Sequence, residues 1–369
     1  MKILLLCWRD STHPQGGGSE RYLERVGEYL AARGHEVVYR TAGHTDAPRR
    51  SERNGVRFSR SGGKFSVYPK ALGGILLGRV GIGTLGGLDA VVDTQNGIPF
   101  FARLVTGAPT VLLTHHCHRE QWPVAGPLIA RLGWFLERHV APRVYRGAPY
   151  VTVSQASKDD LVDIGVTAAD ITIIGNGIDP VPASVPTLAP SPTTHLVTLS
   201  RLVPHKQLEH AMDTLAELSP GRDLCLDVIG SGWWEDELRE YARRRGIADR
   251  VTFHGQVTED YKHALLARAA VHLMPSRKEG WGLAVVEAAQ HGVPTVGYRT
   301  AGGLRDSVHD GETGLLAADP AELTRFTARL LDDAALRTRL GTAAREWVTD
   351  ISWATTGARF EQLLRELAE

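Results

Sequence analysis

The chain has 369 residues, more than one ordinary hydrophobic core accommodates, so two domains are expected. Its 42 basic and 42 acidic side chains cancel, which argues against a protein that binds nucleic acid through a broad positive field. The three cysteines, Cys7, Cys117 and Cys225, form no CxxC pair, so they indicate neither a disulfide framework nor a structural zinc site.

The chain begins with an apolar run that predicts a first β-strand, Lys2–Trp8. This run is too short for the core of a signal peptide, and no segment approaches the ~20 apolar residues of a membrane span. A reducing, cytoplasmic location fits the unpaired cysteines. After the strand come a polar loop that ends in Gly16, Gly17 and Gly18, a helix with Ser19 as the expected N-cap, and a strand at Glu36–Arg40. This β–loop–α–β order predicts a parallel sheet.

Short apolar runs continue the alternation of strands and helices, with a Gly-rich loop and helix over Ala71–Leu88 and a helix over Ser157–Val162. The further strands expected in this half are Val56–Phe58, Ala90–Val92, Thr110–Thr114, Tyr150–Val153 and Ile171–Ile174. The segment Pro180–Pro192 contains five prolines and predicts a linker.

Beyond the linker the alternation starts again. The strands expected there are Leu196–Leu199, Leu224–Ile229, Val251–Phe253, Ala270–Met274, Thr295–Tyr298 and Gly314–Leu316. The helices are Gln207–Leu218, Trp234–Arg245, Asp260–Ala269, Leu283–His291, Ala321–Leu331, Ala334–Val348 and Thr355–Glu369. We therefore expect an α/β protein with Rossmann-like domains over residues 1–180 and 195–354, a linker over 181–194 and a terminal helix over 355–369. In such folds ligands bind beyond the carboxyl ends of the strands, here in a cleft between the halves.

The stretch Ser276–Glu287 connects a buried strand to a helix, with two glycines, Gly280 and Gly282, in the loop. Backbone amides at the start of a helix favour an anion. Two carboxylates flank this loop, Glu279 and Glu287, with seven residues between them. They could act as an acid/base pair, but their spacing better fits acceptors for hydroxyls at two ends of one ligand. Taken alone, Glu287 also fits a solvated helix face.

The three glycines Gly16–Gly18 lie at a strand-to-helix turn, where bare backbone can approach a phosphate; a flexible turn is the alternative. They are not a dinucleotide fingerprint, because Arg21 stands where the third glycine belongs. A G-x-G-x-x-G at Gly81, Gly83 and Gly86 is followed by a strand rather than a helix, so we interpret it as a coincidence.

Three histidines, His115, His116 and His118, follow the strand Thr110–Thr114. A histidine at that strand end can hydrogen-bond a sugar hydroxyl or interact with transition-state charge; a surface cluster is the alternative. No metal site is expected, because the chain has no Asp-x-Asp pair. Two cations, Arg201 and Lys206, follow another strand and suit a diphosphate leaving group, although surface charge would give the same pattern.

Taken together, these segments resemble the retaining glycosyltransferases of family 4, a family with glycogen-synthase-like and mannosyltransferase-like members. The matching segments are Gly16–Gly18, Thr114-His115, Val153-Ser154, Gly175–Asp179, Ser200–Lys206, Gly230–Gly232, His254–Val257, Glu279–Glu287, Gly302–Asp306 and Gly311–Gly314. The resemblance implies the GT-B fold, in which two Rossmann-like domains face a cleft and the C-terminal helix crosses back to the N-terminal domain.

The resemblance also implies roles for particular residues. The catalytic group would be His115, Arg201, Lys206 and Glu279, with His116 replacing His115 if the register is one residue off. In this group the two cations hold the diphosphate and Glu279 binds sugar hydroxyls, while Glu287 would bind the ribose. The other donor-binding residues implied are Gly16, Gly17, Gly18, Gly230, Gln256, Val257, Gly280, Trp281, Gly282 and Leu283.

The implied activity is that of a hexosyltransferase-type enzyme (EC 2.4) that moves a sugar from a nucleoside diphosphate sugar to an acceptor hydroxyl, with retention and without a metal or other cofactor. The resemblance also implies that the N-terminal domain binds the acceptor and the C-terminal domain the nucleotide sugar. The acceptor, a glycan, a lipid or a small metabolite, is not specified, because the N-terminal segment His44–Leu88 matches nothing specific in the family. A nucleotide-sugar epimerase, a phosphorylase and a non-catalytic sugar-nucleotide-binding protein are the alternatives.

A basic segment with aromatic residues is compatible with one further partner, the inner face of a membrane. Arg131, Arg138, Arg143 and Arg146 surround Trp134 and Phe135. Such a helix can lie on an anionic bilayer as a peripheral contact. A solvated or domain-packing helix would show the same composition.

Overall fold

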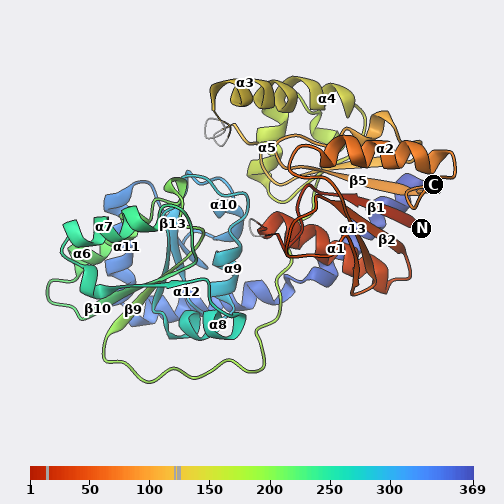
Figure 1. Ribbon diagram of the computed structural model, residues 1–369. Helices are drawn as coiled ribbons and strands as arrows, with labels where there is room; N and C mark the ends of the chain where they lie inside the picture. The colour runs from red at the N-terminus through yellow and green to blue at the C-terminus, as the bar shows by residue number, and fades with distance from the viewer. Residues whose placement is uncertain (14–15, 120–121, 123–125) are drawn as a thin grey trace. The chain divides into compact units, whose positions relative to one another are not determined.

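The computed structural model describes residues 1–13, 16–119, 122 and 126–369, and the chain divides into two compact units (Figure 1). Unit 1 comprises Met1–Gly177 together with Ser352–Glu369, and unit 2 comprises Ile178–Ile351. Each unit is an α/β domain built on its own sheet, as the alternation of strands and helices in the sequence predicts.

Unit 1 contains an eight-stranded sheet with the order β3-β4-β2-β1-β5-β6-β7-β8. Its strands are β1 (Lys2–Leu6), β2 (Glu36–Thr41), β3 (Arg50–Arg53), β4 (Val56–Arg60), β5 (Ala90–Gln95), β6 (Thr110–Thr114), β7 (Tyr150–Thr152) and β8 (Ile171–Ile173). All pairs are parallel except β3 with β4. Residues Ile3–Leu6 of the central strand are fully buried because layers cover both faces of the sheet.

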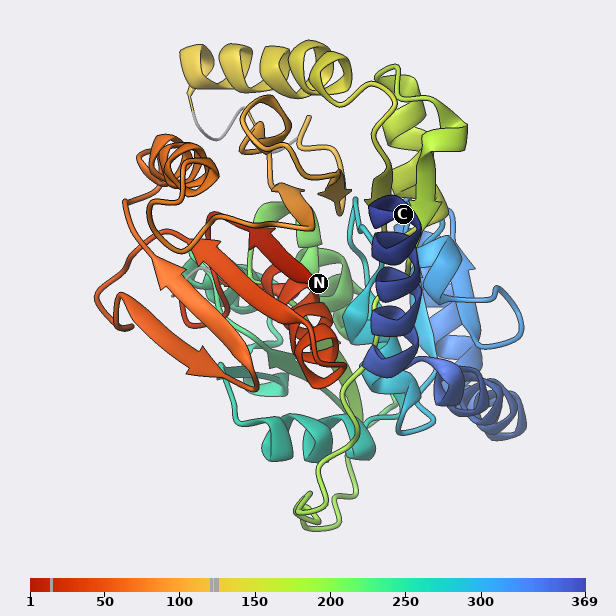
Figure 2. The ribbon, with the colours of Figure 1, turned by 90° about the vertical axis from the view of Figure 1, so that its right-hand side faces the viewer.

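The helices of unit 1 include the last helix of the chain. They are α1 (Gly18–Ala32), α2 (Val67–Arg79), α3 (Pro127–Phe135), α4 (Ala141–Val144), α5 (Gln155–Asp163) and α13 (Trp353–Ala368), with a π-helical turn at Leu136–Val140. Helix α13 packs on α1, and the two lie side by side in Figure 2. Gly357 permits this approach, since a Cβ there would lie 2.3 Å from the Tyr29 ring.

Unit 2 contains a six-stranded parallel sheet with the order β11-β10-β9-β12-β13-β14. Its strands are β9 (Thr194–Leu199), β10 (Leu224–Ile229), β11 (Val251–Gly255), β12 (Val271–Met274), β13 (Thr295–Tyr298) and β14 (Gly314–Ala317). Its helices are α6 (Leu208–Leu218), α7 (Glu235–Arg244), α8 (Glu259–Arg268), α9 (Leu283–Ala289), α10 (Leu304–Ser307), α11 (Pro320–Asp332) and α12 (Ala334–Trp347). The strand order reverses between β9 and β12, which is where such sheets bind ligands.

The starts of α1 and α5 differ from the predicted ones for the same reason. Helix α1 begins at Gly18 with Gly17 as its N-cap, not Ser19, because the Glu20 carboxylate accepts the Gly17 amide at 2.8 Å. Helix α5 begins at Gln155, because Ser154 rather than Ser157 is the cap: its hydroxyl oxygen accepts the Ser157 amide at 3.0 Å. In both cases a serine inside the first turn resembles a cap in the sequence.

Candidate functional site

The loops at the carboxyl edge of the unit 2 sheet pack directly on one another. A Cβ at Gly230 would lie 2.0 Å from the Ser200 carbonyl oxygen, and one at Gly232 would lie 2.1 Å from that of Leu202. The Leu202 amide donates to the Ser231 carbonyl at 3.0 Å. Glycine is therefore required after β10, because the loop that follows β9 occupies the space of a side chain.

The loop Ser276–Gly282, which follows β12, is fixed from two sides. The Arg277 amide donates to the His205 carbonyl at 2.9 Å, and the Gly303 amide donates to the Glu279 carbonyl at 3.1 Å. A Cβ at Gly303 would approach the Gly280 backbone to 2.5 Å. The loops after β9, β12 and β13 thus form one connected layer at the switch point of the sheet.

This layer brings together two predicted catalytic residues that are 73 positions apart, Lys206 and Glu279. The Lys206 Nζ lies 2.5 Å from Glu279 Oε1, and the two side chains are only 13% and 10% exposed. Such a charge-assisted contact fixes the positions of the ammonium and the carboxylate. Arg201, in the same loop as Lys206, is exposed. Its carbonyl oxygen accepts the Val203 amide at 3.1 Å, but its guanidinium makes no hydrogen bond or ion pair with the described residues.

The electrostatics of the β9 loop are dominated by cations. Burial, together with the positive charges of Lys206 and Arg201, lowers the pKa of His205 to about 4. His205 is therefore neutral near pH 7 and adds no charge. Lys206 is held by Glu279, whereas the Arg201 guanidinium has no ion-pair partner among the described residues, so this loop presents two cations to an incoming anion.

The predicted anion loop is constrained at its glycine and its tryptophan. Gly282 has φ +93°, the left-handed region that favours glycine, and is the N-cap of α9. The Trp281 ring stacks with Trp347 at 6.4 Å, and its buried indole nitrogen has no hydrogen-bond partner among the described residues. The backbone of Gly280 contacts Gly303, and Leu283 begins the helix.

The other predicted donor residues lie further along the same unit. Glu287 accepts a bond from the Lys262 ammonium at 2.7 Å. Burial alone would lower the pKa of Lys262. The charges and hydrogen bonds of Glu287 and Glu259 outweigh burial and raise this pKa. Gln256 is exposed and Val257 half-buried directly after β11, where the Gly230 amide donates to Gly255 at 2.9 Å.

Of the three clustered histidines of unit 1, His115, directly after β6, is the buried one. It is 7% exposed, and neither ring nitrogen has a hydrogen-bond partner among the described residues. Its ring meets Tyr22 edge to face at 5.0 Å. Burial lowers the pKa of His115 to about 4, so the ring is neutral near pH 7 with one donor and one acceptor available.

The other two histidines of the cluster differ from His115. The rings of His116 and His118 stack at 4.4 Å. His118 lies beside the buried Glu137, with 3.4 Å between Nδ1 and Oε1. The structure thus separates His115 from its neighbours by burial, a distinction that the sequence does not contain. Its predicted contact with the donor sugar stays a prediction.

The backbone amides of Gly16–Gly18 are partly used in hydrogen bonds within their own segment. The Gly16 amide donates to the His13 carbonyl at 2.7 Å, and the Gly17 amide donates to Glu20. Gly18 begins α1. Two of these three amides therefore have internal acceptors, and the predicted contact with a phosphate stays a prediction.

Sequence reasoning missed a buried carboxylate in unit 1, Glu20. It is fully buried, and Arg9 contacts its Oε1 through Nε at 2.9 Å and through a terminal nitrogen at 2.8 Å. Asn96 and Ser19 also donate to it, at 3.2 and 3.0 Å. Its charge favours a higher pKa of His115, opposite in direction to the larger effect of burial. Gly17 and Ser19 are local partners of Glu20, but Arg9 and Asn96 come from separate segments, so the sequence does not show that this carboxylate is buried.

Among the described residues, one trio could reach a common metal ion: His195, Cys225 and Asp227. Asp227 already accepts bonds from His195 at 2.7 Å, His254 at 2.8 Å and Arg268 at 3.0 Å. A guanidinium on the same carboxylate opposes a divalent cation. Hydrogen bonding therefore accounts for the trio, and it lies on β9 and β10, away from the loops described above.

Comparison with known proteins identifies the family. The family model "Glycosyltransferase Family 4" matches residues 16–181, and "Glycosyl transferases group 1" matches residues 185–347. A GDP-mannose-dependent alpha-(1-6)-phosphatidylinositol monomannoside mannosyltransferase of Mycobacterium tuberculosis is 32% identical over 72% of this chain and 71% of its own length. The chain belongs to glycosyltransferase family 4.

Solved structures share the fold of this glycosyltransferase. A sucrose-phosphate synthase from Thermosynechococcus elongatus aligns with a TM-score of 0.82 at 21% identity, over 99% of this chain and 98% of its own. HepE from Anabaena, in complex with UDP-glucose, aligns over the whole of both chains with a TM-score of 0.76 at 19% identity. The predicted GT-B fold and the predicted class, a glycosyltransferase, are confirmed. Within the described residues, no helix has the length and apolarity needed to cross a bilayer.

Proposed function

We propose that this family 4 glycosyltransferase moves a sugar from a nucleoside diphosphate sugar to an acceptor hydroxyl, and that unit 2 holds the donor. The observation that carries the proposal is the pairing of Lys206 with Glu279 at the switch point of the unit 2 sheet. In this arrangement the ammonium and the nearby Arg201 neutralise the diphosphate as it leaves, and the carboxylate accepts bonds from sugar hydroxyls.

Relatives support the class of donor. HepE was solved with UDP-glucose, and the mycobacterial relative is named as GDP-mannose-dependent. These names differ in both base and sugar, so the proposal covers both donors. The mycobacterial relative is also named for a lipid acceptor, which places lipids beside glycans and small metabolites among the acceptors to be tested.

We propose further that transfer proceeds with retention and without a metal. The cations Lys206 and Arg201 supply the positive charge that a metal would otherwise provide to the diphosphate. A nucleophilic carboxylate is not needed if the acceptor attacks on the face from which the diphosphate departs, with the diphosphate taking its proton. The buried Glu20 is unsuited to act as a nucleophile, since Arg9, Ser19 and Asn96 already engage it. His115, neutral at pH 7, would hydrogen-bond the sugar.

The test removes each member of the pair separately. Lys206→Ala and Glu279→Ala should each abolish sugar transfer and donor hydrolysis, measured as nucleotide release from UDP-glucose and GDP-mannose. Far-UV circular dichroism should show a retained fold. Arg243→Ala is the control, because this exposed cation pairs only with its helix neighbour Glu240 among the described residues. Full activity in either site variant would refute the assignment.

A further inference from the structure

One helical stretch of unit 1 presents apolar side chains to solvent instead of to the core. It runs through α3, the π-helical turn and α4, from Pro127 to Val144, and forms an outer edge of the unit in both ribbon views (Figures 1 and 2). Leu128 is 81% exposed, Ile129 48%, Leu132 59% and Phe135 53%. Monomeric proteins rarely leave a contiguous apolar surface of this kind uncovered.

Helical geometry places the four residues on one stripe. At about 100° per residue they span roughly 120° of the circumference. Gly133 and Glu137, about 100° and 140° from the middle of the stripe, are both buried. A Cβ at Gly133 would lie 2.3 Å from the Trp122 ring, and Trp122 Nε1 donates to Glu137 at 2.6 Å. The helix is therefore fixed by its polar and small residues, and the apolar stripe faces outward.

The charge around the stripe has a single sign. Arg131, Arg138, Arg143 and Arg146 are all exposed. The one carboxylate between residues 126 and 148, Glu137, is fully buried. It accepts bonds from Trp122 and from the His118 amide, so it compensates none of the arginines. The surface is thus both apolar and cationic, which is the composition of helices that lie on anionic bilayers.

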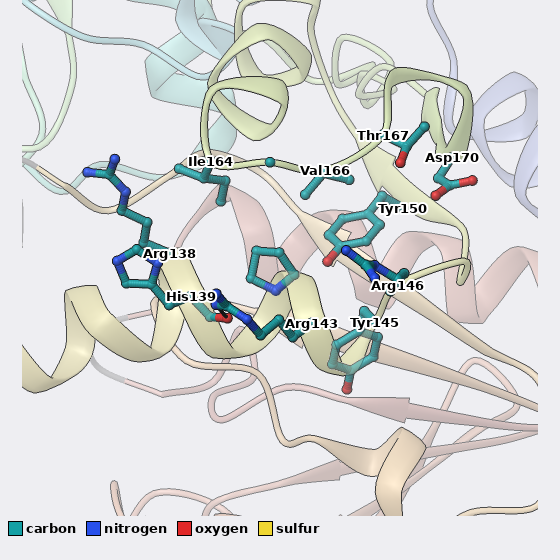
Figure 3. A pocket seen from close by; sticks show the side chains of 12 residues that line it. Arg138, His139, Arg143, Tyr145, Arg146, Tyr150, Ile164, Val166, Thr167 and Asp170 are labelled. Carbon is teal, nitrogen blue, oxygen red and sulfur yellow. Dashed lines mark hydrogen bonds between the residues drawn. The ribbon is translucent and has the colours of Figure 1, made fainter.

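A cavity of about 250 Å³ lies at the C-terminal end of this helix. Figure 3 shows Arg138, Arg143 and Arg146 on the helix side of it, with Thr167 and Asp170 on the side of the loop before β8. Tyr150 also lines the cavity, and its buried hydroxyl has no partner among the described residues. Three guanidinium groups against one carboxylate favour an anionic group of the size of a phosphate.

We propose that the helix Pro127–Val144 is the contact surface of this chain for a membrane of anionic phospholipids. Leu128, Leu132 and Phe135 enter the boundary between headgroups and acyl chains. The arginines bind lipid phosphates, and the cavity beside α4 holds one of them. Charge complementarity selects this occupant over a second copy of the chain, because a symmetric pair would bring the arginines of both copies together. The inference does not rest on the proposed reaction, since binding needs no turnover.

The experiment is co-sedimentation of the full chain with vesicles of phosphatidylcholine alone and of phosphatidylcholine with an equal amount of phosphatidylglycerol. Binding should require phosphatidylglycerol and weaken at high salt. The pair Arg138→Gln and Arg143→Gln should lower the partition coefficient about 30-fold, from ~1 kcal/mol of attraction for each arginine. The pair Leu128→Gln and Leu132→Gln should lower it by more than about tenfold, through lost apolar burial.

The matched control is the pair Arg243→Gln and Arg244→Gln, which removes the same charge from the exposed face of α7 in unit 2. It should sediment as the wild type does. All variants should keep the wild-type melting temperature and donor turnover, because the altered residues are exposed and outside the donor site. The proposal is overturned by no binding to either vesicle, by equal binding to both, or by equal loss in the control. It is also overturned by a dimer in light scattering that the leucine variants dissociate.

Discussion

The position of the Glu279 loop depends on Gly303, so Gly303→Ala tests whether that position matters for catalysis. Gly303 has φ −61°, which alanine adopts without strain. The added Cβ, however, would lie 2.5 Å from the carbonyl carbon and oxygen of Gly280 and 2.7 Å from the Glu279 carbonyl oxygen. The substitution therefore acts on the loop through a pure steric overlap.

The size of the effect follows from this overlap. Ordinary contacts begin near 3.4 Å, so the loop must move by about 1 Å, and its backbone has no flexible side chain that could yield instead. Overpacking of this kind costs about 1–3 kcal/mol of folding free energy. A displacement of about 1 Å in a group that positions substrate costs on the order of 100-fold in rate. We expect kcat/KM for the donor to fall by that factor while most molecules stay folded.

The assay measures nucleotide release at several donor concentrations, with the melting temperature recorded in parallel. Gly73→Ala is the matched control: it also adds one methyl group, but nothing lies within 4 Å of the added Cβ, and it sits in α2 of unit 1. Its activity should be unchanged and its stability equal or higher. A Gly303→Ala enzyme with wild-type kcat/KM would refute the claim that this loop positions the donor.

Two further predictions concern unit 1. Because burial lowers the pKa of His115 from 6.5 to about 4, the unfolded chain binds its proton more readily; wild type should lose about 3 kcal/mol relative to His115→Leu as pH falls from 6.5 to 4. Urea unfolding of both proteins at the two pH values measures this, and identical pH dependence would contradict it. Gly357→Ala should loosen α13 from α1, since its Cβ would overlap Tyr29. Hydrogen exchange should then speed up in α13 but not in α12, and uniform protection would refute that reading.

Strands and most helices could be predicted from the sequence because buried apolar runs mark them. Thr110–Thr114, Leu224–Ile229 and Thr295–Tyr298 have the same bounds in the structure. Strand β3, Arg50–Arg53, was missed because its four residues are polar and its pairing with β4 is antiparallel at the sheet edge. An edge strand does not need to alternate apolar and polar residues, so its sequence gives little indication that it forms a strand.

The site was predictable only as separate pieces. Lys206 and Glu279 each follow a strand, which the sequence indicates, but their contact depends on β9 and β12 being neighbours in the sheet. Strand order is a property of the whole fold. Likewise, nothing in the run His115–His118 tells which ring is buried; that follows from α1, which places Tyr22 against His115. In the sequence, the apolar stripe of α3 looks like an ordinary core-facing helix face. The structure shows that the helix is instead buried at Gly133, so the stripe faces outward.

The central claim is that unit 2 binds a nucleoside diphosphate sugar through Lys206 and its neighbours without a metal. The most direct measurement is the melting temperature of wild type and of Lys206→Ala with UDP-glucose and with GDP-mannose, in the presence of a metal chelator. At about 100 times the dissociation constant a ligand stabilises the folded state by ~2.7 kcal/mol, which shifts a melting curve clearly. We expect at least one donor to stabilise the wild type and not the variant. No stabilisation by any nucleotide sugar, or an equal shift in the variant, would contradict the account.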